Sequence, residues 1–145
     1  MAENDEREIL ALLRAQEDAT ARGDAAGVIA PLADDVVNYD LPPPLEYRGA
    51  AARDADGLNQ WFDTWDGPVT VELADPTIIV DGNLAVVFGH SRMRGHKKQS
   101  GPVDSWNRRT VVLRRTDDAW RIVHEHNSYP VKMDGSGQAA TDLEP

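Results

Sequence analysis

The stretch WRIVHEHNSYP, residues 120–130, combines the pattern of a β-strand with side chains that can carry acid–base chemistry. Alternate residues of a strand point to one face, so we expect His124, His126 and Ser128 on the same side as Ile122. Imidazoles titrate near neutral pH and can transfer protons. The spacing therefore predicts a proton-transfer site on one face of this strand.

Two preceding strand-like segments carry side chains of similar character. Trp106 and Arg108 share a parity in DSWNRRT, and His90 falls on the parity of Phe88 in LAVVFGHSR. An arginine that points into a closed chamber needs a carboxylate or an anionic ligand, because an unpaired buried charge is costly. Mixed aromatic and polar walls are typical of small-molecule pockets. We therefore predict that these residues line a pocket together with the histidines.

Asp40, at the end of LADDVVNYD, is the candidate general base. Desolvation raises the pKa of a carboxyl group on the wall of an apolar pocket, so that it can accept a proton. A second interpretation stays open, because an aspartate before Leu-Pro can equally bond backbone amides in a turn. Further side chains are expected to contact a ligand without reacting with it: Gln16, Tyr39, Trp61 and Trp65.

The composition excludes several classes of protein. The 145 residues include no cysteine and have a formal net charge of −10, which argues against thiolate metal sites and against binding to phosphate backbones or anionic lipids. Two histidines spaced like His124 and His126 are weak evidence for a metal, and we predict no metal and no other cofactor. The chain shows neither a secretory signal nor a membrane span. We expect a cytoplasmic protein without nucleic-acid or membrane partners.

The periodicity predicts an α+β fold with three helices before a meander of long strands. Apolar residues recur at helical spacing until Gly23, a weaker helix follows and reaches Leu32, and the aromatic stripe of LNQWFDTW ends at Gly67. Alternating segments then follow, joined by turns at DGN and TDDA. This order predicts helices on one face of a curved, mainly antiparallel sheet. We expect one domain over residues 1–130 and a flexible tail over 131–145.

Several segments resemble the SnoaL-like, ketosteroid-isomerase-like branch of the NTF2-like superfamily. They are GDAAGVIAPLADDVVNYD, YRG before a helix ending in WFDTW, DGNLAVVFG, WNRRT and WRIVHEHNS, and the resemblance covers roughly residues 5–130. It implies a cone in which three helices and a strongly bent sheet enclose a pocket, and in many members a homodimer. One scaffold of this kind carries many chemistries or none.

The resemblance implies two alternative functions. The first is a cofactor-independent isomerase, dehydratase or cyclase for a hydrophobic carbonyl compound, with Asp40 as base, His126 or His124 as acid or orienting partner, and Arg108 as anion stabiliser. Gln16 replaces the tyrosine of the ketosteroid isomerase oxyanion hole, and the acidic partner is missing, which disfavours steroid isomerisation itself. The second is a non-catalytic domain that binds a ligand or mediates dimerisation.

We also expect a homodimer through the outer face of the sheet. If the histidines face the pocket, the opposite parity presents apolar side chains outward, and an exposed apolar sheet surface usually finds a partner. The residues expected on that face are Val87, Val111, Leu113 and Val123.

Overall fold

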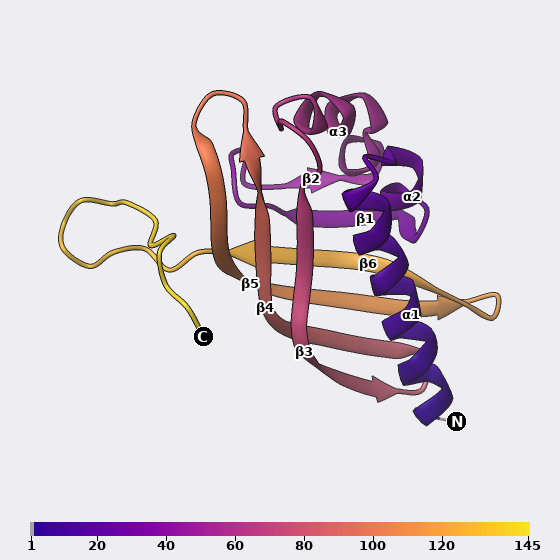
Figure 1. The fold of residues 1–145 in the computed structure, drawn as a ribbon. Helices are drawn as coiled ribbons and strands as arrows, with labels where there is room; N and C mark the ends of the chain where they lie inside the picture. The colour runs from indigo at the N-terminus through magenta and orange to yellow at the C-terminus, as the bar shows by residue number, and fades with distance from the viewer. Residues whose placement is uncertain (1) are drawn as a thin grey trace.

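The computed structural model describes residues 2–145 and shows helices covering one face of a strongly bent, six-stranded sheet (Figure 1). Its helices are α1 (Ala2–Ala21), α2 (Ala25–Ile29) and α3 (Ala55–Phe62), with a 3₁₀ helix at Gly49–Arg53. Its strands are β1 (Leu32–Tyr39), β2 (Tyr47–Arg48), β3 (Thr70–Asp81), β4 (Leu84–Lys97), β5 (Gly101–Thr116) and β6 (Ala119–Ser128). None of the helices within residues 2–145 has the length and apolar character of a membrane span.

The strands are arranged in the order β2-β1-β6-β5-β4-β3. Only β1 and β6 pair in parallel, and all other neighbours are antiparallel. The turn between β5 and β6 places Asp117 at φ 52° and Asp118 at φ 63°. Two successive left-handed residues match the twist of a tight hairpin, and aspartate tolerates this conformation better than most residues. The predicted α+β fold with a mainly antiparallel sheet is confirmed.

Two helix boundaries differ from the prediction. The second helix ends at Ile29 and Leu32 already belongs to β1, because Pro31 lacks an amide hydrogen and cannot continue a helix. The predicted third helix is divided, since the Asp54 side chain accepts a hydrogen bond from the Gly57 amide and starts α3 anew. Trp65 consequently lies beyond α3, where it forms an isolated bridge with Lys97.

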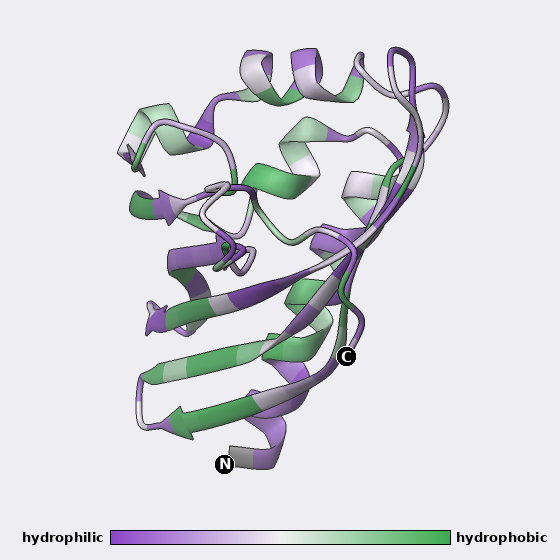
Figure 2. Cartoon of the chain, turned by 90° about the vertical axis from the view of Figure 1, so that its left-hand side faces the viewer, coloured by the Kyte–Doolittle hydropathy of each residue, from purple (hydrophilic) through white to green (hydrophobic). Residues whose placement is uncertain are grey.

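The apolar core lies between α1 and the inner face of the sheet. Val111 and Leu113 of β5 have no exposed area, and they cluster with Val87 of β4 and with Ile9 and Leu13 of α1. Hydrophobic residues predominate at the end of the sheet that lies near the N-terminus of the chain, and hydrophilic residues are more frequent at the opposite end (Figure 2). The prediction that this parity forms an exposed dimer face is therefore wrong, because α1 covers it.

A β-bulge at Val123 changes the phase of β6. Leu113 pairs with Ile122, but the preceding residue of β5, Val112, pairs with His124, so Val123 is an extra residue on β6. Ile122 therefore points inward with Leu113, while His124 points outward with Val112. The prediction that Ile122 and His124 share a face is wrong, because strict alternation does not survive an inserted residue.

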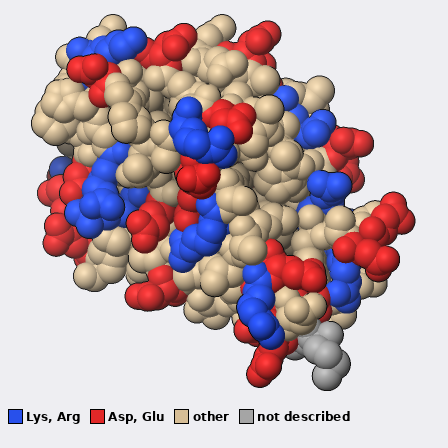
Figure 3. All heavy atoms as spheres, turned by 45° about the vertical axis from the view of Figure 1, so that its right-hand side comes forward, with Lys and Arg blue, Asp and Glu red and all other residues tan. Residues whose placement is uncertain are grey.

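Charged side chains of both signs are mixed on one face of the molecule (Figure 3). On the face that Figure 3 shows, basic and acidic groups lie side by side. Along α1, for example, Arg14 pairs with Glu17 at 2.6 Å and Arg22 pairs with Asp18 at 3.0 Å. This face therefore lacks the broad basic surface that nucleic-acid binding requires.

The segment after β6 folds back on itself. Val131 forms a bridge with Ala139, the Lys132 amide donates to the Gln138 carbonyl at 2.8 Å, and Ala140 is buried. The tail that we expected to be flexible thus has hydrogen-bonded structure, and its mobility stays a prediction.

The assignment of the two sheet faces predicts that replacing two leucines by alanine lowers the free energy of unfolding by different amounts. Leu113→Ala should lower the free energy of unfolding by about 2–5 kcal/mol, because it leaves a cavity beneath α1. Leu84→Ala, on the outer face where the side chain is 44% exposed, should cost much less. Urea unfolding followed by circular dichroism measures both values, and equal losses would contradict the assignment.

Candidate functional site

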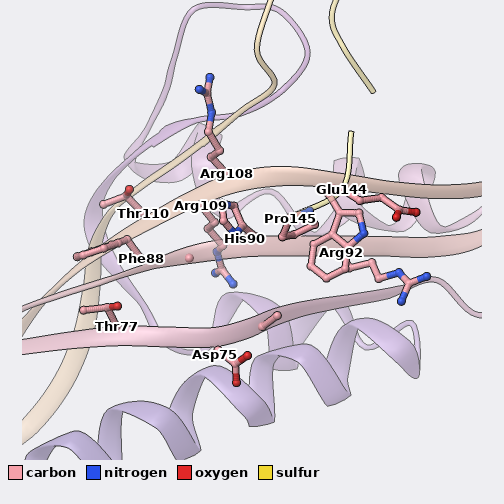
Figure 4. A pocket seen from close by; sticks show the side chains of 13 residues that line it. Asp75, Thr77, Phe88, His90, Arg92, Arg108, Arg109, Thr110, Glu144 and Pro145 are labelled. Carbon is pink, nitrogen blue, oxygen red and sulfur yellow. The ribbon is translucent and has the colours of Figure 1, made fainter. Parts of the chain in front are cut away.

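Several of the predicted polar and aromatic residues meet on the outer face of the sheet. Consecutive cross-strand partners form two adjacent rows there, Thr77-Phe88-Thr110-His126-Tyr39 and Ala74-His90-Arg108-Ser128. The side chains of Arg108 and Arg109 leave β5 in opposite directions (Figure 4). We expected the first of these to point inward, and that orientation is wrong because the parity of Val111 and Leu113 occupies the inner face.

An open groove with a volume of about 790 Å³ crosses this outer face. Thr77, Phe88 and Thr110 lie at one end of it, and Arg92 and Glu144 lie at the other (Figure 4). Three of the predicted site residues line the groove, namely His90, Trp106 and Arg108. Glu144 and Pro145 bring the C-terminal segment against β4 and β5, which the sequence did not indicate.

Three arginines line the groove, and two of them, Arg92 and Arg108, lie on the outer face and differ in their partners. Arg92 donates two hydrogen bonds to Asp104, at 2.8 and 2.7 Å, and its guanidinium lies 5.3 Å from the ring centroid of Trp106. These bonds lower the pKa of Asp104 and raise the pKa of Arg92, so the pair stays ionised over a wide pH range. Arg108 is exposed, and it donates from Nε to the Ser128 hydroxyl at 3.2 Å. Within residues 2–145 it has no carboxylate partner, so its remaining N–H groups are free to bind an anion.

The histidines of β6 form an aromatic cluster beside the groove. The Tyr39 ring lies edge-on to His124 at 4.7 Å and to His126 at 5.3 Å. Nδ1 of His124 is 2.7 Å from the Val37 carbonyl, a geometry that requires Nδ1 to carry the proton and donate it. Residues 2–145 contain no group of three or more His, Cys, Asp or Glu side chains placed to hold a metal.

Four other predicted residues lie away from the groove. Asp40 is exposed, and its carboxylate accepts a hydrogen bond from the Leu41 amide at 2.7 Å, which is the turn alternative considered above. Trp61 and Trp65 lie next to each other near α3, with ring centroids 5.7 Å apart. Gln16 lies on the inner side, where its Nε2 donates to the carbonyl of residue 28 at 3.0 Å.

A buried polar cluster lies on the inner face, and the sequence patterns did not predict it. Arg109 is only 8% exposed, and its Nη2 donates to Glu125 at 2.8 Å and to Gln16 at 3.1 Å. Ser91 and Asn107, a directly opposed pair nearby, are also buried, and Ser91 Oγ and Asn107 Oδ1 have no hydrogen-bond partner among the described residues. Arg109 was not among the residues predicted to line a site. Its parity with the apolar residues of β5 was the signal that could have placed it inside.

The comparisons with known proteins agree with this architecture. The model of the SnoaL-like domain matches residues 9–132. The chain belongs to the SnoaL-like family. A solved NTF2-like protein of unknown function from Pseudomonas putida KT2440 is 32% identical to this SnoaL-like chain, with a TM-score of 0.84. The match covers 100% of this chain and 99% of the Pseudomonas putida protein.

Two more distant structures share the fold of this SnoaL-like chain, and they support the fold only. One, from Xanthomonas campestris, is provisionally named a calcium/calmodulin dependent protein kinase II association domain. It is 21% identical, with a TM-score of 0.71, and the match covers 84% of this chain and 85% of that protein. Another, from Streptomyces avermitilis, is provisionally named a dehydratase of the NTF2-like family. It is 18% identical, with a TM-score of 0.73, and the match covers 87% of this chain and 97% of that protein. No curated protein matches the chain significantly.

The inner cluster predicts a strong energetic coupling between its two charges. Glu125→Leu should lower the free energy of unfolding by about 3–5 kcal/mol, because Arg109 would remain buried without a counter-charge. Adding Arg109→Met to this variant should restore most of the loss, as measured by urea unfolding. Arg22→Gln, which breaks an ion pair whose side chains are 59% and 69% exposed, should cost about 0–1 kcal/mol. Additive losses in the double variant would contradict the coupling.

Proposed function

We propose that this SnoaL-like protein binds a small, partly hydrophobic molecule with a carboxylate or enolate group in the outer groove. The observation that carries the proposal is the groove itself. Its volume of about 790 Å³ suits a small molecule. Its wall combines the rings of Phe88 and Trp106 with the Arg108 guanidinium, which has no carboxylate partner among residues 2–145. The planar fork of Arg108 matches a carboxylate or an enolate.

The strand register explains how one ligand can contact both kinds of group. His90 and Arg108 are directly opposed on β4 and β5, so their Cβ atoms lie about 4.5–5.5 Å apart and their polar ends can share one anionic group. The neighbouring row places Phe88 beside Thr110 on the same face. A ring packed against Phe88 would therefore bring an attached carboxylate toward Arg108.

The proposal is restricted to binding. Isomerisation, dehydration or cyclisation was expected to use Asp40 as the base, and Asp40 does not line the groove. The Streptomyces avermitilis protein provisionally named a dehydratase shares only 18% identity with this chain, so its name lends support at the level of the fold alone.

Benzoate and benzyl alcohol are a matched pair of probes, because they differ mainly in the charged group. Wild-type protein should bind benzoate more tightly, and Arg108→Gln should weaken benzoate binding by about tenfold, as expected for loss of one charge-assisted contact. Isothermal titration calorimetry and amide chemical shifts of residues around the groove measure this effect.

Arg114→Gln provides the control for this experiment, because Arg114 is an exposed arginine of β5 that does not line the groove. The control should bind benzoate like the wild type, and Arg108→Gln should not change the binding of benzyl alcohol. Shifts confined to residues outside the groove, or equal losses in the two arginine variants, would reject the proposed site.

Homodimerisation through the same outer face is the second candidate function. Ile79, Leu84 and Phe88 are 54%, 44% and 41% exposed there, and their alternation along β3 and β4 places them on the side opposite α1. A second copy of the chain would remove this apolar surface from water. The Xanthomonas campestris structure, provisionally named an association domain, supports the candidate at the level of the fold.

Light scattering coupled to gel filtration tests this candidate. The wild type should elute as a dimer at micromolar concentration, and Phe88→Glu should convert it to a monomer by placing a charge in the apolar contact. Leu45→Glu, in a loop where the side chain is 96% exposed, should leave the dimer intact. A monomeric wild type would remove the candidate, whereas benzoate binding would still test the groove separately.

A further inference from the structure

Lys97 lies against two tryptophan rings at the end of β4. Its Nζ is 4.3 Å from the ring centroid of Trp65 and 5.8 Å from that of Trp61. Gly95, two residues earlier on the same face of the strand, makes room for this arrangement, because a Cβ atom there would lie 2.8 Å from the Trp65 ring. The amine is therefore held in a partly buried position with apolar walls.

Within the described part of the chain, one hydroxyl provides the polar contact of this amine. Nζ of Lys97 donates to Oγ1 of Thr64 at 2.5 Å, and the same hydroxyl donates to the Trp61 carbonyl at 2.6 Å. Because the hydroxyl proton is committed to the carbonyl, Thr64 can only accept from Lys97. A neutral amine at this position would keep its lone pair free for reaction.

Two opposing effects act on the charge of Lys97. Burial lowers its pKa below the ordinary value, because the ammonium ion loses hydration. The ring faces of Trp61 and Trp65 favour the ammonium ion. No carboxylate adds to that second effect, since none of the ion pairs formed within residues 2–145 includes Lys97.

We propose that Lys97 is the lysine at which this protein reacts with small aldehydes and ketones to form an imine. The lone pair of neutral Nζ adds to the carbonyl carbon, and the two amine protons leave with the carbonyl oxygen as water, so the step needs neither oxidant nor reductant. Apolar walls of this kind activate lysine amines by disfavouring the charged form. An aromatic carbonyl compound additionally gains contact with Trp61.

The other lysines of the chain make the proposal easy to test. The sequence contains three lysines, and Lys98 and Lys132 are both exposed, whereas Lys97 is partly buried. Solvent accessibility alone predicts that the two exposed lysines react first. The proposal predicts the reverse order.

Reductive benzylation measures that order directly. The folded protein is treated briefly at neutral pH with benzaldehyde and sodium cyanoborohydride, which reduces an imine to a stable benzylamine, and adducts are quantified by peptide mass spectrometry. Lys97 should be labelled at least about threefold faster than Lys98 or Lys132. Lys97→Arg should lose its own adduct and leave labelling of Lys98 and Lys132 unchanged.

Two further measurements separate the folded environment from the local sequence. Labelling in urea should abolish the preference, because unfolding removes the contacts with Trp61 and Trp65. In the folded protein, the rate at Lys97 should reach half its maximum at a lower pH than the rate at Lys132, since a lowered pKa exposes the neutral amine earlier. Labelling of Lys97 no faster than Lys98, or a preference that persists in urea, would overturn the proposal.

Discussion

The packing of α1 against alternate residues of β5 determines how the rest of the molecule is arranged. Val111 and Leu113 are fully buried beneath this helix, and side chains of a strand alternate between faces. Once those two residues face inward, Arg109 must also face inward and Arg108 must face outward. A shift of one residue would exchange the two arginines and expose the whole apolar set.

The inner face accepts a charge because its partners are already in place. Arg109 meets a carboxylate from β6 and an amide from α1, namely Glu125 and Gln16. Burying an ion costs roughly several kcal/mol of desolvation free energy, and a hydrogen-bonded partner of opposite charge offsets much of that cost. The same arrangement leaves Arg108 on the outer face without a carboxylate partner among the described residues. The different surroundings of these neighbouring arginines therefore follow from the alternation of one strand.

The two proposed sites lie on different sides of the sheet and use different chemistry. The groove offers a guanidinium beside aromatic rings on the outer face. Lys97 offers an amine between tryptophans on the parity of Gly95, where Trp65 packs against β4. The SnoaL-like fold supports both, because long strands expose two faces with independent side-chain sets. Membership of the family thus says more about the scaffold than about the reaction.

Local patterns in the sequence predicted the helices, the turns and the α+β class, since periodicity and turn chemistry depend on neighbouring residues. They also predicted that His90, Trp106 and Arg108 share a face, because parity is a property of each strand and its register. The choice of face depended on tertiary structure, since only long-range packing decides which parity α1 covers. The bulge at Val123 and the return of Glu144 to the groove were likewise decided by contacts between segments distant in the chain.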